Sequence, residues 1–161
     1  YTIDRHSVEV VTRLGRETPR GNRYDDRHYQ ALLLAGILHD VGKRPGVFDH
    51  AAEGARHASM VLKRMGFDRD IIWWVTLLVR EHLTLSEFAT GQNPNDPNVG
   101  DELASRLDHD PLLLDMLFDL TRADGSSLGA TAGETISKRY GWSKWRETLV
   151  RTMYNATRYH M

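Results

Sequence analysis

Eight histidines and no cysteine stand in this chain of 161 residues. Most of these histidines, with two aspartates, fall on helical stripes that are otherwise apolar; the set is His6, His39, Asp40, His50, His57, His82 and Asp124. Buried imidazoles and carboxylates are costly unless they satisfy one another or a cation. One such histidine is more often a hydrogen-bonded core residue, but this number on separate segments favours a shared metal ion. Because thiolates are absent, imidazole and carboxylate are the ligands that remain for a transition metal.

The run His39-Asp40-Val41-Gly42-Lys43 is the strongest local signal for chemistry. Neighbouring side chains on a helix point about 100° apart, and the last turn of a helix opens, so His39 and Asp40 can converge on one ion. Gly42 allows the chain to turn away from the helix. Lys43 follows directly, where its ammonium group can meet a phosphate oxygen.

The elements that carry these residues are predicted to be helices, because apolar residues recur at helical spacing and strand signals are weak. The predicted fold class is therefore all-α, a helical bundle with the metal site between buried helices. Asp49 and Asp68 precede two of the stretches as N-caps, and Asp-Pro pairs at 96–97 and 110–111 begin two more. The predicted helices span about 1–17, 27–41, 50–65, 69–83, 97–108, 111–124, 134–140 and 143–158.

Two polar stretches, residues 84–100 and 125–133, are predicted to be loops because they are rich in glycine, proline or small residues. In the last helix, Trp145, Leu149 and Met153 fall on one face and are predicted to be its apolar stripe. The four tryptophans are predicted to be core residues.

Length and composition limit the class of protein. At about 150 residues per domain, 161 residues make one domain, predicted to span residues 1–161. The net charge of −1 gives no electrostatic footprint for nucleic acid. Because no apolar run reaches about 18 residues, no membrane partner is expected. The absence of cysteine leaves the redox compartment undecided, and a cytoplasmic location is favoured. The first residue is Tyr1, so the chain is expected to be a fragment of a longer protein.

The series His6, His39-Asp40, His50, His82 and Asp124 resembles the HD phosphohydrolase superfamily. In that superfamily the first histidine, the His-Asp pair and a distal aspartate bind one metal, and further histidines bind a second metal in many members. The resemblance implies a first site of His6, His39, Asp40 and Asp124. It also implies that Asp40 bridges to a second site completed by His50 and His82.

Longer segments resemble a narrower family, the HD domain of the GlnD enzymes, which are bifunctional PII uridylyltransferase/uridylyl-removing enzymes. The similar segments are 1–6, 38–43, 49–55, 74–86 and 120–124, with Trp142, Trp145, Leu149 and Tyr154 near the end. In that family a nucleotidyltransferase domain precedes the HD domain and ACT domains follow it. Residues 44–48 and 125–131 depart from the family pattern, and both segments border the expected pocket.

The resemblance implies a metal-dependent phosphodiesterase that removes UMP, or AMP as in some actinobacterial relatives, from a tyrosine of the signalling protein PII. Asp40 and Lys43 are the expected catalytic residues. One or two divalent ions are expected as cofactors, and Mn, Fe, Mg and Zn all suit these ligands. Such an ion makes hydroxide available near neutral pH, and a tyrosine phenolate with a pKa of about 10 leaves with little protonation.

Three points stay open at this stage. Another HD phosphohydrolase, acting on free nucleotides, ppGpp or cyclic dinucleotides, is the alternative within enzymes. A non-catalytic metal- or nucleotide-binding regulatory module is the alternative of another class. His57 follows His50 by two helical turns, roughly 10 Å, so both cannot bind the same ion, and a role other than ligand is favoured for His57.

Overall fold

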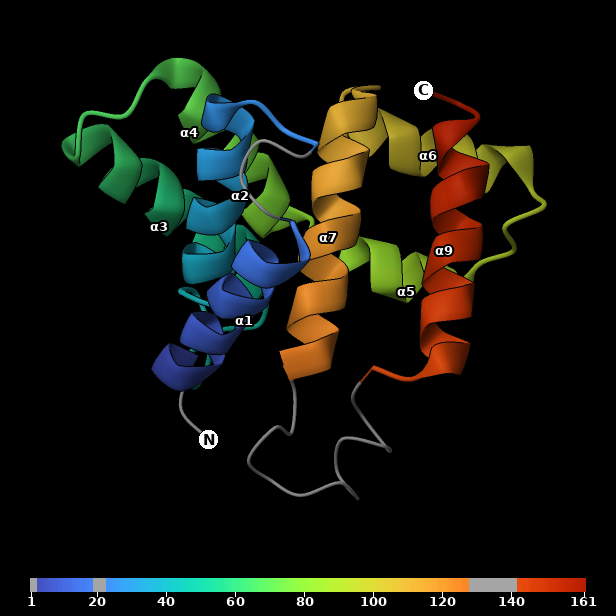
Figure 1. The fold of residues 1–161 in the computed structure, drawn as a ribbon, viewed down its shortest axis with the longest axis horizontal. Coiled ribbons are helices and arrows are strands. Elements are labelled where there is room, and N and C mark those ends of the chain that lie inside the picture. Colours follow the sequence, from blue (N-terminus) through green and yellow to red (C-terminus); the bar gives the residue numbers. More distant parts are fainter. Residues whose placement is uncertain (1–2, 19–22, 128–141) are drawn as a thin grey trace. The chain divides into compact units, whose positions relative to one another are not determined.

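The computed structural model describes residues 3–18, 23–127 and 142–161, and within these ranges the regular structure is helical, without a strand (Figure 1). The prediction of an all-α fold is therefore confirmed. The chain divides into two compact units, residues 1–82 and residues 83–161, and each is described by itself.

The first unit contains α1 (Ile3–Glu17), α2 (Asp26–Leu38), α3 (His50–Arg64) and α4 (Arg69–Arg80). Helix α4 packs against α2 and α3, and α1 packs against α2. Aspartates begin three of these helices: the side chains of Asp25, Asp49 and Asp68 accept hydrogen bonds from backbone N–H groups in the first turn. These caps satisfy donors that have no partner within the helix, which is why the helices begin at these positions.

The predicted stripe of α4 lies in the core of the first unit, since Ile71, Val75 and Leu78 are all buried. On α3 the buried face consists of Ala51, Ala55, Ala58 and Leu62 with Gly54. These small residues allow α3 to approach its neighbours closely.

The second unit contains α5 (Thr84–Gly91), α6 (Pro97–Arg106), α7 (Pro111–Ser127) and α9 (Lys144–Arg158). Helix α9 packs against α5, α6 and α7. The predicted Asp-Pro starts are present, with Asp96 as the N-cap of α6 and the Asp110 side chain accepting from the N–H of Leu112. Leu113, Leu117 and Leu120 are fully buried on α7.

Two predicted loops are wrong in part. Residues 84–91 form α5, because Leu85, Phe88 and Ala89 at helical spacing are buried and outweigh the nearby glycine and prolines. Helix α7 continues three residues past its predicted end, to Ser127, whose hydroxyl donates to the carbonyl oxygen of Ala123. The predicted helix at 134–140 lies outside the described residues.

The predicted stripe of the last helix is also wrong in part. Trp145 is 66% exposed, whereas Val150, Met153 and Thr157 are buried. Trp73 is likewise exposed rather than a core residue. An exposed tryptophan can stand at the same helical spacing as buried apolar residues. Only the neighbouring helices decide which face of a helix is buried.

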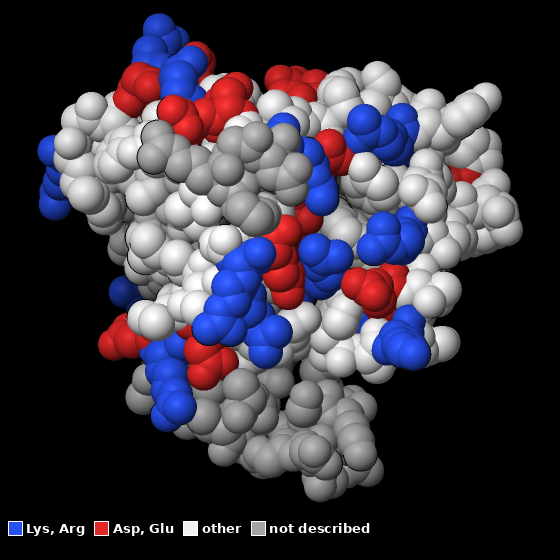
Figure 2. All heavy atoms as spheres, viewed as in Figure 1, with Lys and Arg blue, Asp and Glu red and all other residues white. Residues whose placement is uncertain are grey.

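The surface carries both signs of charge. Figure 2 shows Lys and Arg side chains interspersed with Asp and Glu across the visible face, as the net charge of −1 leads one to expect. Among the described helices, none combines the length and apolar character needed to cross a membrane.

Candidate metal centre

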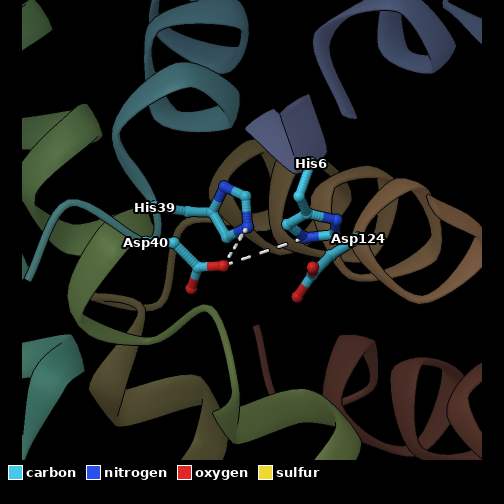
Figure 3. Close-up of side chains that lie close together, drawn as sticks. All are labelled: His6, His39, Asp40 and Asp124. Atoms are coloured by element: carbon cyan, nitrogen blue, oxygen red, sulfur yellow. Dashed lines mark ion pairs between the residues drawn. The ribbon is translucent and has the colours of Figure 1, made fainter. Parts of the chain in front are cut away.

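Three buried side chains of the first unit, His6, His39 and Asp40, point toward one another (Figure 3). His6 comes from α1, and the other two follow the end of α2. One nitrogen or oxygen from each lies within 4.8 Å of the others. Asp40 Oδ2 is 3.4 Å from His39 Nε2 and 3.8 Å from His6 Nε2. Contact between α1 and α2 thus brings His6 to the His-Asp pair.

A second group shares Asp40 and adds His50 and His82. His50 begins α3 and His82 follows α4, so all four helices of the unit contribute to the centre. Asp40 Oδ1 lies 3.5 Å from His82 Nε2, while the other oxygen faces His39 and His6. The ring centres of His50 and His82 are 5.8 Å apart. One carboxylate therefore presents a different oxygen to each group of imidazoles.

Backbone carbonyls orient two of the imidazole rings. His39 Nδ1 is 2.8 Å from the carbonyl oxygen of Gly36, and His82 Nδ1 is 2.7 Å from that of Val79. Because a carbonyl only accepts, each Nδ1 carries a hydrogen, and each Nε2 is directed toward Asp40. A second nitrogen that donates to a carbonyl is the usual arrangement behind a metal-bound histidine.

The residues present fit a divalent cation. Nε2 of His50 and Nε2 of His82 are buried and have no hydrogen-bond partner among the described residues. A buried nitrogen lone pair without a donor is costly, and a cation satisfies it. Neutral imidazoles with a carboxylate suit Mn, Fe, Zn or Mg. The geometry and the donor types thus agree on a metal.

Asp40 is ionised near neutral pH. Burial opposes the charge, but the neighbouring His39 and His82 rings, with the positive charge of Lys43, outweigh it and hold the pKa of Asp40 well below its usual range. A carboxylate that keeps its charge at a buried position is suited to share two cations.

Lys43 lies at the rim of the centre. Its Nζ is 3.9 Å from Asp40 Oδ2, and its side chain is about half exposed. The ammonium is therefore both close to Asp40 and open to an incoming anion.

His57 belongs to neither group. Its Nε2 is 3.1 Å from Glu53 Oε1, one turn earlier on α3, and its side chain is 32% exposed. Asp124 is carried by α7 in the second unit, where it is half-buried. Its share in the centre stays a prediction.

Sequence reasoning missed the supports behind the ligands. The carbonyls of Gly36 and Val79 each lie three residues before the histidine that they orient. Any histidine at the end of a helix has a carbonyl at this spacing, so the sequence gives no specific signal for these contacts. Gly54 was missed as well, although it lies against the backbone of Gly42. The small residues around Gly54 are the signal that could have indicated a close approach.

These features define a class: an all-α domain whose helices converge on a buried His/Asp centre. The sequence profile of the HD domain family matches residues 3–119, and the chain belongs to that family. Asp124 lies beyond the matched range.

Three curated relatives carry the name bifunctional uridylyltransferase/uridylyl-removing enzyme. The one from Caulobacter vibrioides is 32% identical over 168 residues, covering 98% of this chain. Those from Streptomyces coelicolor and Mycobacterium tuberculosis are 36% and 33% identical, each over 93% of the chain. The predicted resemblance is thus confirmed. The chain spans about a sixth of these relatives, since it covers 16% to 17% of their length. No solved structure matches the chain.

Proposed function

We propose that this chain is a metal-dependent phosphodiesterase that removes a nucleotidyl group, UMP or AMP, from a tyrosine of a PII protein. The observation that carries the proposal is Asp40, whose two oxygens face the Nε2 atoms of different histidines. Two-metal sites stabilise both the attacking and the leaving oxygen in phosphoester hydrolysis, and Asp40 would help to hold both cations.

The ligand assignment is part of the proposal. His6, His39, Asp40 and Asp124 would hold one cation, and Asp40, His50 and His82 would hold a second. Cations bound there would supply a nucleophilic hydroxide near neutral pH and would offset charge on the phosphoryl oxygens.

The protein side chains provide orientation and charge. Asp40 is ionised before any substrate arrives, because its pKa is lowered by the neighbouring histidines despite burial. The contacts with the Gly36 and Val79 carbonyls keep Nε2 of His39 and Nε2 of His82 directed at the same carboxylate. Lys43, exposed at the rim, donates to a non-bridging phosphate oxygen and stabilises the negative charge that develops there.

The choice of substrate is supported by the relatives, whose names include a uridylyl-removing activity. The proposal includes residues 1–161 as a single HD domain within a longer cytoplasmic protein that also carries nucleotidyltransferase and ACT domains. It further assigns no nucleic-acid and no membrane partner to this chain.

The test is a substrate panel with added Mn, Fe, Mg or Zn. Purified chain is given UMP-PII, AMP-PII, ppGpp, a cyclic dinucleotide and bis-p-nitrophenyl phosphate, and product release is followed. We expect hydrolysis of a nucleotidylated PII, and a large loss in Asp40→Asn. The matched control is His109→Ala, because His109 is half exposed and pairs only loosely with Asp101, 3.9 Å away.

Each other outcome has a distinct meaning. Preferential turnover of ppGpp or a cyclic dinucleotide contradicts the PII substrate and leaves a phosphohydrolase. Absence of bound metal together with absence of turnover contradicts the enzyme itself and favours a regulatory module.

A further inference from the structure

Phe48 lies two residues before the candidate ligand His50 and has no role in the proposed hydrolysis. Its side chain is fully exposed, whereas Phe88 and Phe118 are at least nine-tenths buried. Burying a phenylalanine contributes roughly 1.5–3 kcal/mol relative to leaving it in water. A ring that folding leaves in water next to metal ligands is therefore available to a ligand.

The segment that carries Phe48, residues 43–49, links Asp40 to His50 and is held by its own backbone. The N–H of Lys43 donates to the carbonyl oxygen of Asp40 over 3.0 Å, and the N–H of Val47 donates to that of Arg44 over 3.3 Å. Asp49 ends the segment as the N-cap of α3. Phe48 is thus displayed on an anchored turn.

Side chains tie the same turn to α3. Arg44 Nη2 is 3.0 Å from Glu53 Oε1, and Arg56 Nη2 is 2.7 Å from the same oxygen. His57 Nε2 lies 3.1 Å from that oxygen too. One carboxylate thus faces two guanidinium groups, and the Asp49 carboxylate directly follows Phe48, so charges of both signs surround the turn. Each guanidinium has five N–H donors, so donors remain for an anion.

The separation from the centre suits one nucleoside. Phe48 precedes the ligand His50 by two residues, so their Cα atoms are at most about 7 Å apart. The phosphorus and the base of a nucleotide are separated by the sugar over a comparable distance. Aromatic stacking with nearby cations is the chemistry by which proteins bind nucleotides without reading base edges.

We propose that Phe48 is a substrate-binding residue that stacks on the nucleobase of the phosphoester, on the turn that Arg44 and Glu53 anchor. The proposal rests on the proposed function in one respect, namely that the centre takes a nucleotide phosphoester. The ligand class is a nucleoside monophosphate or its ester. Because every base has a π-face, Phe48 accepts uracil and adenine alike.

The test compares binding of UMP with binding of inorganic phosphate to the Mn-loaded protein by titration calorimetry. Phe48→Ala is expected to weaken UMP about tenfold and to leave phosphate unchanged, since phosphate has no base. Phe48→Trp is expected to bind UMP at least as tightly as the wild type. The matched control is Met65→Ala, an exposed apolar side chain at the other end of α3, which should change neither ligand.

Several results overturn the assignment. They are equal weakening of UMP and phosphate in Phe48→Ala, unchanged binding of both, and failure of the wild type to bind UMP. Loss of turnover on UMP-PII with unchanged UMP binding also overturns it, because Phe48 would then contact the protein part of the substrate. If the wild type binds UMP but hydrolyses no diester, the proposed function fails while the comparison of UMP with phosphate still decides the role of Phe48.

Discussion

Gly42 packs directly against the backbone at Gly54. A Cβ atom built on Gly42 would lie 2.4 Å from the amide nitrogen of Gly54 and 2.3 Å from the carbonyl oxygen of His50. Backbone atoms cannot move aside as a flexible side chain can, so only glycine fits at position 42. This contact holds the turn that carries His39 and Asp40 against the first turn of α3, which carries His50.

Replacement of Gly42 is expected to separate the two groups of ligands. Gly42→Ala should lower the free energy of unfolding by about 1–3 kcal/mol and weaken metal binding, because the turn must move away from His50. Urea denaturation and metal analysis measure the two effects. Gly15→Ala is the matched control: its added Cβ meets nothing within 4 Å on α1. Gly15→Ala should stabilise the helix by about 0.5–1 kcal/mol. Unaltered metal binding in Gly42→Ala would show that the close approach of Gly42 to Gly54 does not position the ligands.

The number of bound ions should depend on which face of Asp40 is altered. His82→Asn removes the imidazole that faces Oδ1 and should leave one ion, as should His6→Asn on the side of Oδ2. Asp40→Asn should lose both, because it removes the shared charge. Elemental analysis of protein dialysed with Mn gives the stoichiometry. Equal loss of both ions in His82→Asn would refute the division into two groups.

His57 should be dispensable for the metal. Its ring pairs with Glu53 on the outer side of α3, and Glu53 keeps its two arginine partners without it. His57→Ala is therefore expected to retain the full metal content and kcat, while His50→Ala at the start of the same helix loses metal. A drop in metal content for His57→Ala would make it a ligand after all.

A tyrosine in the second unit should give that unit a pH-dependent stability. Tyr154 donates to Asp115, and burial together with this carboxylate raises the pKa of Tyr154. The native state then holds a proton that the unfolded state loses above about pH 10, so the contribution is complete below pH 10 and declines as pH rises toward the native pKa.

Tyr154→Phe tests this sign. At pH 7 the variant should be less stable by about 1 kcal/mol, the usual contribution of one hydrogen bond. The difference from the wild type should shrink in denaturation at pH 11. Tyr159→Phe, at an exposed ring, should match the wild type at both values. If the stability difference between Tyr154→Phe and the wild type grew with pH, the pKa of Tyr154 would not be raised in the native state.

Short-range signals in the sequence were enough to predict the helical class, most helix starts and the candidate ligands. Asp49, Asp68 and Asp96 cap helices through bonds to N–H groups two or three residues away, so their effect needs no distant partner. The adjacency of His39 and Asp40 is likewise a property of the chain alone.

The tertiary structure decided what depends on distant partners. It set which oxygen of Asp40 faces which histidine, the outward position of Trp145, and the helix at Thr84–Gly91 that polar composition had concealed. Capping energy acts within a few residues, whereas burial and side-chain orientation come from packing between helices that the chain separates by tens of residues. The sequence could therefore predict candidate side chains for the centre, but only the packing of four helices could show which oxygen of Asp40 faces which of the histidines.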